Sequence, residues 1–249
     1  MKRCVYLSHL GWMAGLFLSF SACAPVEMNC PVATDQKSSF MAMPSGFPLQ
    51  VISDPTWSSA ERLALQRAME RWNIVGRQQM SETVFGEVSG VVTTLSTDKA
   101  LQGCDLDQGD SEKFVIYRAE SLSRWQTYGF SAVTPAVTLR CHRGDELTKQ
   151  AILVNPSLIH SDQMMSVFLH ELGHTVGLDH SCQMEGSSTS YRGCAGLESD
   201  HPYVLAVMFP TLKVKAPSAR PLFTTPGTLE VKESLGSNDI SRAGCVFRR

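Results

Sequence analysis

Three histidines and one glutamate stand close together in the sequence, at spacings that suit a metal ion. His170 and His174 are four residues apart, and Glu171 directly follows the first of them. Side chains four residues apart on a helix lie on one face, one turn apart, so both imidazoles can reach the same ion. Two histidines do not complete a catalytic zinc site, which takes three protein ligands and keeps a position open for water.

His180 is the candidate for the third ligand, but only if the helix stops before it. Six more helical residues would carry this side chain about 9 Å along the axis, away from the ion. Gly177 lies in between, and glycine accepts the positive φ of a sharp turn after a helix. The three histidines are therefore predicted to bind one zinc ion, with Glu171 beside it as a general base.

Hydrophobic patterns predict the elements that must position this site. Ser58 and Glu61 form a capping box before a helix with one apolar face, which Gly76 is expected to end. That apolar face consists of Leu65, Ala68, Met69 and Trp72. The helix with the histidines is expected from about residue 161 or 162 to 177, and a last helix from about 238 to the chain end. Strands are predicted at 49–53, 84–95, 114–117, 132–139 and 151–154, which gives an α+β domain.

Composition favours one folded domain and excludes several classes of protein. The chain has 249 residues, of which 43% are hydrophobic and 18% charged, and a formal net charge of −2. These values exclude disordered, collagen-like and coiled-coil proteins. No apolar run reaches the ~18–20 residues of a membrane span. Because the chain lacks a basic block, nucleic acid is not an expected partner. We also expect the protein to be a monomer.

The N-terminal segment has the features of an export signal. Lys2 and Arg3 precede an apolar stretch over residues 10–20, and small residues follow before Cys23. Residues 20–23 resemble the lipobox of bacterial lipoproteins, in which Cys23 becomes the lipid anchor. Cleavage after Ala24, which would give a secreted protein, is the alternative.

This resemblance predicts three segments and a location. Residues 1–22 would be the signal peptide, 23–47 a lipid-anchored flexible tether, and 48–249 the folded domain. The protein would be exported to the bacterial cell envelope, as an outer-membrane lipoprotein facing the periplasm or the surface. The membrane would be a partner through the anchor.

The segment over residues 170–180 resembles the signature of the metzincin zinc proteases, and Ser181 is what matrixins carry after the third histidine. Residues 207–210 resemble the matrixin Met-turn, in which Met208 would pack beneath the zinc. Residues 235–240 resemble the start of the matrixin C-terminal helix, where Asp239 would support that turn.

The resemblance covers about residues 48–249 and implies a metzincin-like domain. Such a domain has a twisted, mainly parallel mixed sheet, an active-site helix, a Met-turn and a C-terminal helix. The implied activity is zinc-dependent hydrolysis of peptide bonds in extended protein or peptide substrates. In metzincins the substrate pairs with an edge strand upstream of the active-site helix, and residues after Pro210, through about 226, would form the outer wall of the S1′ pocket. The implied edge strand is Ala151, Ile152, Leu153, Val154 and Asn155. The competing hypothesis is a non-catalytic zinc-containing envelope lipoprotein with a binding or scaffolding role.

Other residues around the site are expected to be structural. Export to an oxidising compartment favours disulfides among the six cysteines that remain besides Cys23 after signal removal. Fifteen pairings are possible. We predict Cys182–Cys194 beside the metal, which leaves Cys104–Cys141 and Cys30–Cys245 by elimination. Ca²⁺ binding by Asp105, Asp107 and Asp110 stays an open alternative, although no EF-hand glycine or terminal glutamate follows them. The isolated His142, His160 and His201 are expected at the surface or in structural roles.

Overall fold

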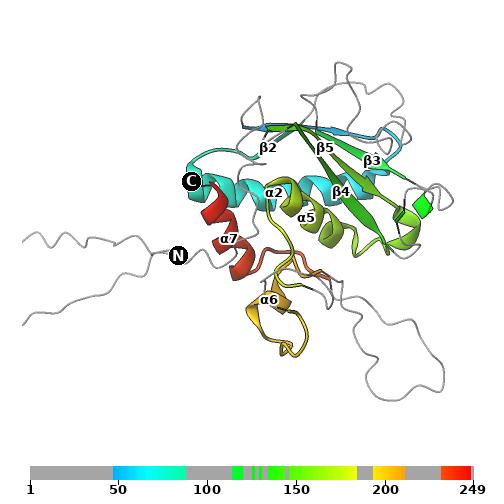
Figure 1. Ribbon diagram of the computed structural model, residues 1–249. Helices are drawn as coiled ribbons and strands as arrows, with labels where there is room; N and C mark the ends of the chain where they lie inside the picture. The colour runs from blue at the N-terminus through cyan, green and yellow to red at the C-terminus, as the bar shows by residue number, and fades with distance from the viewer. Residues whose placement is uncertain are drawn as a thin grey trace, which may run out of the picture.

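The structure of the chain is a computed structural model (Figure 1). It describes residues 47–87, 114–119, 125–126, 129–130, 134–143, 146–183, 193–210 and 231–247. Outside these residues lie the predicted signal peptide, the predicted anchor Cys23, the predicted tether up to residue 46, and Asp105, Asp107 and Asp110. Within the described residues, no helix is long and apolar enough to cross a membrane.

In the described part of the chain, five strands form one mixed sheet, as the sequence predicts. They are β1 (Leu49–Ser53), β2 (Phe85–Glu87), β3 (Phe114–Arg118), β4 (Ala136–Arg143) and β5 (Glu146–Val154), in the spatial order β2-β1-β3-β5-β4. Three of the four strand pairings are parallel, and only β4 runs antiparallel, to β5. The α+β class and the mainly parallel sheet are therefore confirmed. The first predicted strand has the observed bounds, whereas β4 starts later and β5 earlier than predicted.

The prediction that residues 151–155 form an edge strand is wrong. β5 lies inside the sheet, because Ile152 pairs with Ile116 of β3 on one side and with Thr138 of β4 on the other. The side chains of residues 150–154 are almost fully buried, which is typical of a central strand covered on both faces. The edge next to β5 is instead β4.

Helix α2 (Ser59–Met80) begins where the capping box predicts but ends later than expected. Ser58 N donates to Glu61 Oε2 at 2.7 Å, and Glu61 N donates to Ser58 Oγ at 3.2 Å. The helix continues past Gly76 and ends at Met80, and its C-cap residue Ser81 has a φ of 63°. A Cβ at Gly76 would lie 2.8 Å from Glu82 O and even closer to the Val84 side chain. Gly76 therefore permits close packing rather than ending the helix.

The remaining helices lie near the site. They are the 3-10 turn η1 (Pro156–Leu158), α5 (Met164–Thr175), the short α6 (Pro202–Leu205) and α7 (Ser237–Phe247). Residues 161–163 form a turn, so α5 starts slightly after the predicted position. The last helix starts one residue before its predicted position.

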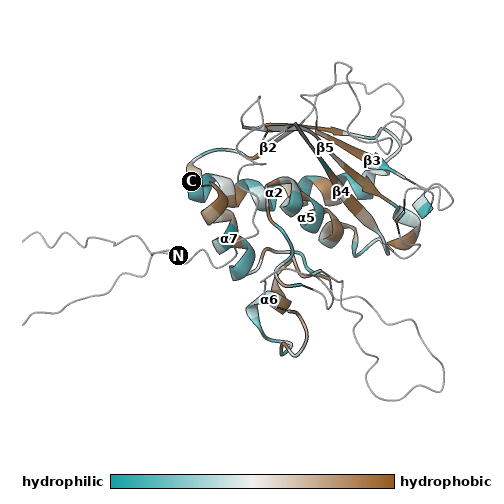
Figure 2. Ribbon diagram, viewed as in Figure 1, coloured by the Kyte–Doolittle hydropathy of each residue, from teal (hydrophilic) through white to brown (hydrophobic). Residues whose placement is uncertain are grey.

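The main core lies between the sheet and the pair of helices α2 and α5 (Figures 1 and 2). Trp57 and Phe168 pack edge to face at 5.6 Å between ring centroids, and Trp72 Nε1 donates to Leu169 O at 3.0 Å. On the opposite face of the sheet, Trp125 packs with Leu153 and other apolar side chains. Helix α5 also contacts the edge strand β4.

Candidate metal centre

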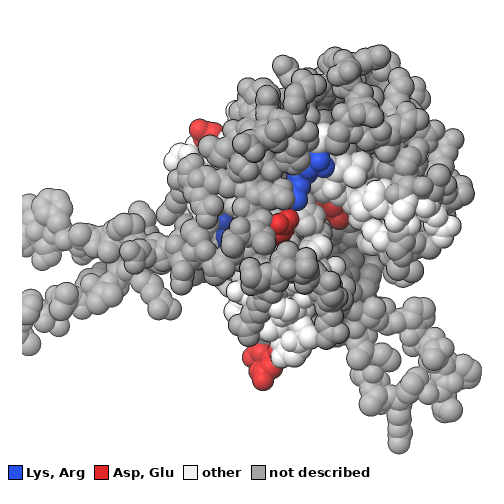
Figure 3. Space-filling view, in the orientation of Figure 1, with Lys and Arg blue, Asp and Glu red and all other residues white. Residues whose placement is uncertain are grey.

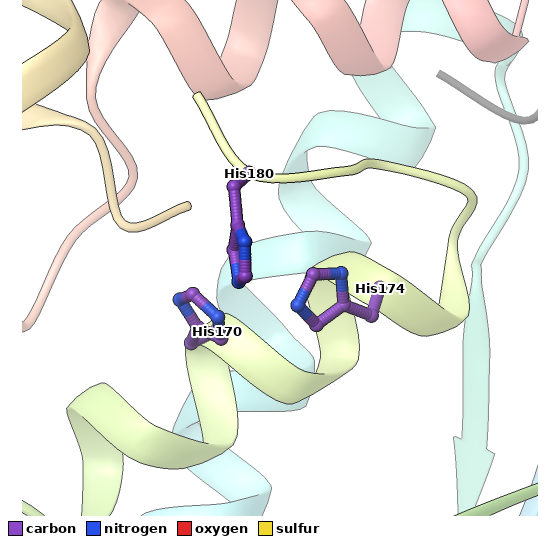
Figure 4. A group of neighbouring side chains, drawn as sticks. All are labelled: His170, His174 and His180. Carbon is purple, nitrogen blue, oxygen red and sulfur yellow. The ribbon is translucent and has the colours of Figure 1, made fainter. Parts of the chain in front are cut away.

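The three predicted ligands converge on one point. His170 and His174 project from α5, and His180 reaches the same place from the segment that follows the helix (Figure 4). One ligand atom from each imidazole lies within 4.8 Å of those of the other two. The structure thus brings together the three histidines that the sequence pattern singles out.

A tight turn after α5 returns the chain to the site. Gly177 has a φ of 96° and lies just beyond the last helical residue, as predicted. Its N–H donates to His174 O, and Leu178 N–H donates to Gly173 O, each at 3.0 Å. These two bonds form a Schellman motif, which satisfies the last carbonyls of a helix while reversing the chain. The chain therefore brings His180 back to α5, next to His170 and His174.

Backbone carbonyls orient two of the imidazoles. His170 Nδ1–H donates to Val207 O, and His174 Nδ1–H donates to Leu178 O, both at 2.8 Å. Each ring is thereby held in the tautomer that leaves Nε2 without a proton, which is how metal-binding histidines are usually oriented.

The third ligand is held through its backbone. Arg242, a buried side chain of α7, donates from Nη2 to Asp179 O at 2.7 Å and to His180 O at 3.3 Å. Arg140 of β4 forms an ion pair with Asp179, at 3.3 Å between Nη2 and Oδ1. The segment with His180 is therefore tied to both α7 and the sheet edge.

The surroundings keep the three imidazoles neutral, which is the form that binds metal. Burial, reinforced by the neighbouring His180, lowers the pKa of His170 to about 4. Burial first, and then the neighbouring imidazoles, hold the pKa of His174 well below its usual value. Burial also lowers the pKa of His180. Three neutral imidazoles, two of them with fixed tautomers, suit a zinc ion.

Glu171 lies in the same cleft as the histidines and is only 6% exposed. Thr138 of β4 donates from Oγ1 to Glu171 Oε2 at 2.6 Å. Burial raises the pKa of the Glu171 carboxyl to about 7, against the opposing effect of the bond from Thr138. A carboxyl with a pKa near neutrality can both accept and return a proton at pH 7.

Met208 packs against α5, and Asp239 binds the backbone next to it. Met208 is fully buried, and a Cβ placed on Gly173 of α5 would collide with its sulfur. The Asp239 carboxylate accepts from the N–H of Val207 at 2.8 Å, of Met208 at 3.1 Å and of Gly236 at 2.8 Å. Because Val207 O also holds His170, Asp239 supports the metal centre through one shared peptide unit.

The centre opens into a cleft of about 670 Å³ between β4 and α5. Its lining includes the three histidines, Glu171, the β4 residues 136–140, Leu158, Ile159, Val167, Phe209 and Pro210. Figure 3 shows acidic and basic side chains close together near the middle of the face that Figure 1 presents. The segment after Pro210 that is predicted to form the outer wall of the S1′ pocket lies outside the described residues.

Thr138 and Arg140 are the cleft residues that sequence reasoning missed. Both belong to β4, whose place beside β5 was not recognised. A signal was available, because only Gly144 and Asp145 separate Arg143 from Glu146. Two residues of this type between two strands indicate a β-hairpin.

One of the predicted disulfides is confirmed. Cys182 and Cys194 are bonded, and their bridge lies directly after the third histidine. Cys141 and Cys245 are also disulfide-bonded, and their predicted partners, Cys104 and Cys30, lie outside the described residues.

The isolated histidines stay apart from the metal centre. His160 is exposed, and His201 caps α6 by accepting from Tyr203 N at 3.1 Å. Both agree with the predicted surface or structural role. The side chain of His142 is not among those described.

No protein-family model matches the chain, and no curated protein matches its sequence. Among solved structures, the chain is similar to high choriolytic enzyme 1, a hatching enzyme zinc-protease from the medaka fish Oryzias latipes. The similarity covers 80% of this chain and 88% of that chain, at 12% identity and a TM-score of 0.40. A likeness this distant assigns no function, which has to come from the site itself.

Proposed function

We propose that this chain is a zinc-dependent endopeptidase. The observation that carries the proposal is the convergence of three neutral imidazoles with Glu171 in one cleft. Three histidine ligands leave room for a water molecule, which is typical of catalytic rather than structural zinc sites. No fourth His, Cys, Asp or Glu joins the three histidines among the described residues.

The side chains of the cleft have distinct roles in this proposal. His170, His174 and His180 would hold the zinc ion, which when bound acts as a Lewis acid toward a carbonyl and toward water. Glu171 would take a proton from the attacking water and return it to the leaving amine. Met208, packed against α5 and held through Asp239, would form the Met-turn beneath the ligands.

The substrate would lie along β4 rather than along β5. Among the described strands, β4 has a neighbour on one side only, and its middle residues line the cleft. An extended peptide can add to such an edge through main-chain hydrogen bonds. We infer that the cleaved bond would lie beside β4, within reach of the Glu171 carboxylate.

Zinc analysis and peptide digestion test this function together. The purified chain should contain one equivalent of zinc and cleave members of a broad peptide library. Cleavage should stop with a chelator and return on addition of zinc. Glu171→Gln should keep the zinc and lose cleavage, because the amide cannot accept the proton.

Other results would contradict the peptidase. Unchanged activity of Glu171→Gln would exclude the proposed mechanism. One bound zinc without any cleavage, and no thermal shift with a hydroxamate, would favour the non-catalytic envelope lipoprotein.

We further propose that the chain is exported and anchored through Cys23. The support is the N-terminal pattern alone, with its basic start, apolar stretch and lipobox-like residues 20–23. Mass spectrometry of the mature N-terminus should find a lipid on Cys23, and Cys23→Ser should release the protein from membranes. A mature chain that starts at Pro25 would show the secreted alternative instead.

A further inference from the structure

The hydroxyl side chain of Thr138 lies in the cleft beside Glu171. It lies in the middle of β4 and lines the cleft, with Ala136 and Arg140 on the same face of the strand. Ala136 belongs to the main core, whereas Val137 and Leu139 pack on the opposite face of the sheet. The Thr138 side chain therefore points toward α5.

The hydroxyl has one proton, and the geometry indicates where it goes. Its oxygen lies 2.6 Å from Glu171 Oε2 and 3.2 Å from the main-chain oxygen of the same residue. That main-chain oxygen already accepts from the Thr175 hydroxyl at 3.1 Å. The short bond to the carboxylate is therefore the one that Thr138 donates.

The strand does not need this hydroxyl for its own stability. Thr138 is paired with Ile152 in the β4–β5 ladder through the backbone, so the side chain adds nothing to the register. Valine has the same shape, a similar preference for strands and no polar group to satisfy. The hydroxyl serves instead to bond the carboxylate of Glu171.

We propose that Thr138 is a positioning residue that orients the Glu171 carboxylate for proton transfer. This inference rests on the proposed peptidase function. The bond from Thr138 holds Oε2 against the edge strand, which leaves Oε1 to accept the proton of the attacking water. Because β4 is also the proposed substrate strand, the same residue fixes the distance between the base and the peptide.

The test compares Thr138→Val, Thr138→Ser and the wild type, with Thr175→Val as a matched control. Thr138→Val should lower kcat by about 10–100-fold, the range seen when a supporting partner of a metal site is removed. KM should stay within about twofold of the wild-type value, and zinc content should remain one equivalent. Thr138→Ser should restore kcat to within a few fold. Thr175→Val, which removes a hydroxyl bonded only to the main chain of Glu171, should keep the wild-type kcat.

A binding measurement separates positioning from folding. Peptide affinity should be the same for Glu171→Gln with and without Thr138→Val, because the strand is unchanged. If Thr138→Val does not fold, Thr138→Ala is measured in its place, with the same expected result.

Three results would overturn the inference. A kcat of Thr138→Val within twofold of the wild type would exclude the role of Thr138, while an inactive Glu171→Gln would still support the peptidase. A raised KM with lost peptide affinity, or no recovery with serine, would show a structural role in the strand. A wild-type protein that cleaves no peptide would overturn both proposals.

Discussion

Replacing Asp239 with alanine should weaken both the fold and the metal centre. The Asp239 carboxylate is buried and accepts three backbone N–H groups, from Val207, Met208 and Gly236. The bond from Gly236 also caps the start of α7, because Gly236 is the residue before that helix. Alanine leaves all three donors without their partner.

The size of the effect follows from the number of donors. Each buried polar group left unsatisfied costs about 1–3 kcal/mol, so three give a gross loss of about 3–9 kcal/mol. Water entering the space and relief from burying a charge reduce this loss, and we expect about 3–5 kcal/mol for Asp239→Ala. Asp239→Asn keeps an oxygen where Oδ2 accepts from Val207 and Gly236, and loses only the bond from Met208. It should cost about 1–3 kcal/mol.

Zinc binding should fall together with stability. Val207 donates to Asp239 and accepts from His170, so a looser Val207 leaves the first ligand less well oriented. Loss of such support typically weakens metal affinity by about 10–100-fold. Urea unfolding of the metal-free protein and a zinc competition titration measure the two effects separately. If Asp239→Ala unfolds within about 0.5 kcal/mol of the wild type and binds zinc equally well, the reasoning is refuted.

Four further predictions concern the supports of the site. Gly177→Ala should cost about 1–2 kcal/mol in urea unfolding because of its positive φ, and an unchanged midpoint would contradict the turn. Replacing both Cys182 and Cys194 by serine should cost about 3 kcal/mol, since their bridge closes a loop between residues 12 apart. Equal thermal midpoints would argue against a stabilising bridge. Arg242→Met should weaken zinc binding by about 10–100-fold in competition titrations, because two carbonyls at the third ligand lose their donor, and equal affinity would exclude this role. Burial raises the pKa of the Asp239 carboxyl, so this carboxyl keeps its proton to a higher pH in the folded state than in the unfolded state. The folded state of the wild type therefore loses stability as the pH rises above about 4. The stability difference between the wild type and Asp239→Asn should therefore shrink as the pH rises, and a growing difference would contradict the shift.

Local features were predictable because they depend on neighbours in the chain. The capping box of α2 requires only two residues three apart, and the structure forms it as predicted. Gly177 was predictable in the same way, since a sharp turn between two ligands requires a positive φ there. Gly76 was misinterpreted as a helix end because the sequence does not show that Val84 packs directly against it.

The sequence by itself determined the candidate metal ligands and the candidate base. His170, Glu171 and His174 lie on one α-helix, whose pitch fixes the distances between their side chains. These distances are the same in any fold that contains the helix.

Only the tertiary structure decided what faces these residues across the cleft. The strand next to the site is β4 rather than β5, because a hairpin folds β4 back along the outside of a buried strand. That pairing brings Thr138 to Glu171 from 33 positions away in the chain. Strand order depends on which surfaces pack together, and an isolated run of apolar residues does not distinguish a central strand from an edge.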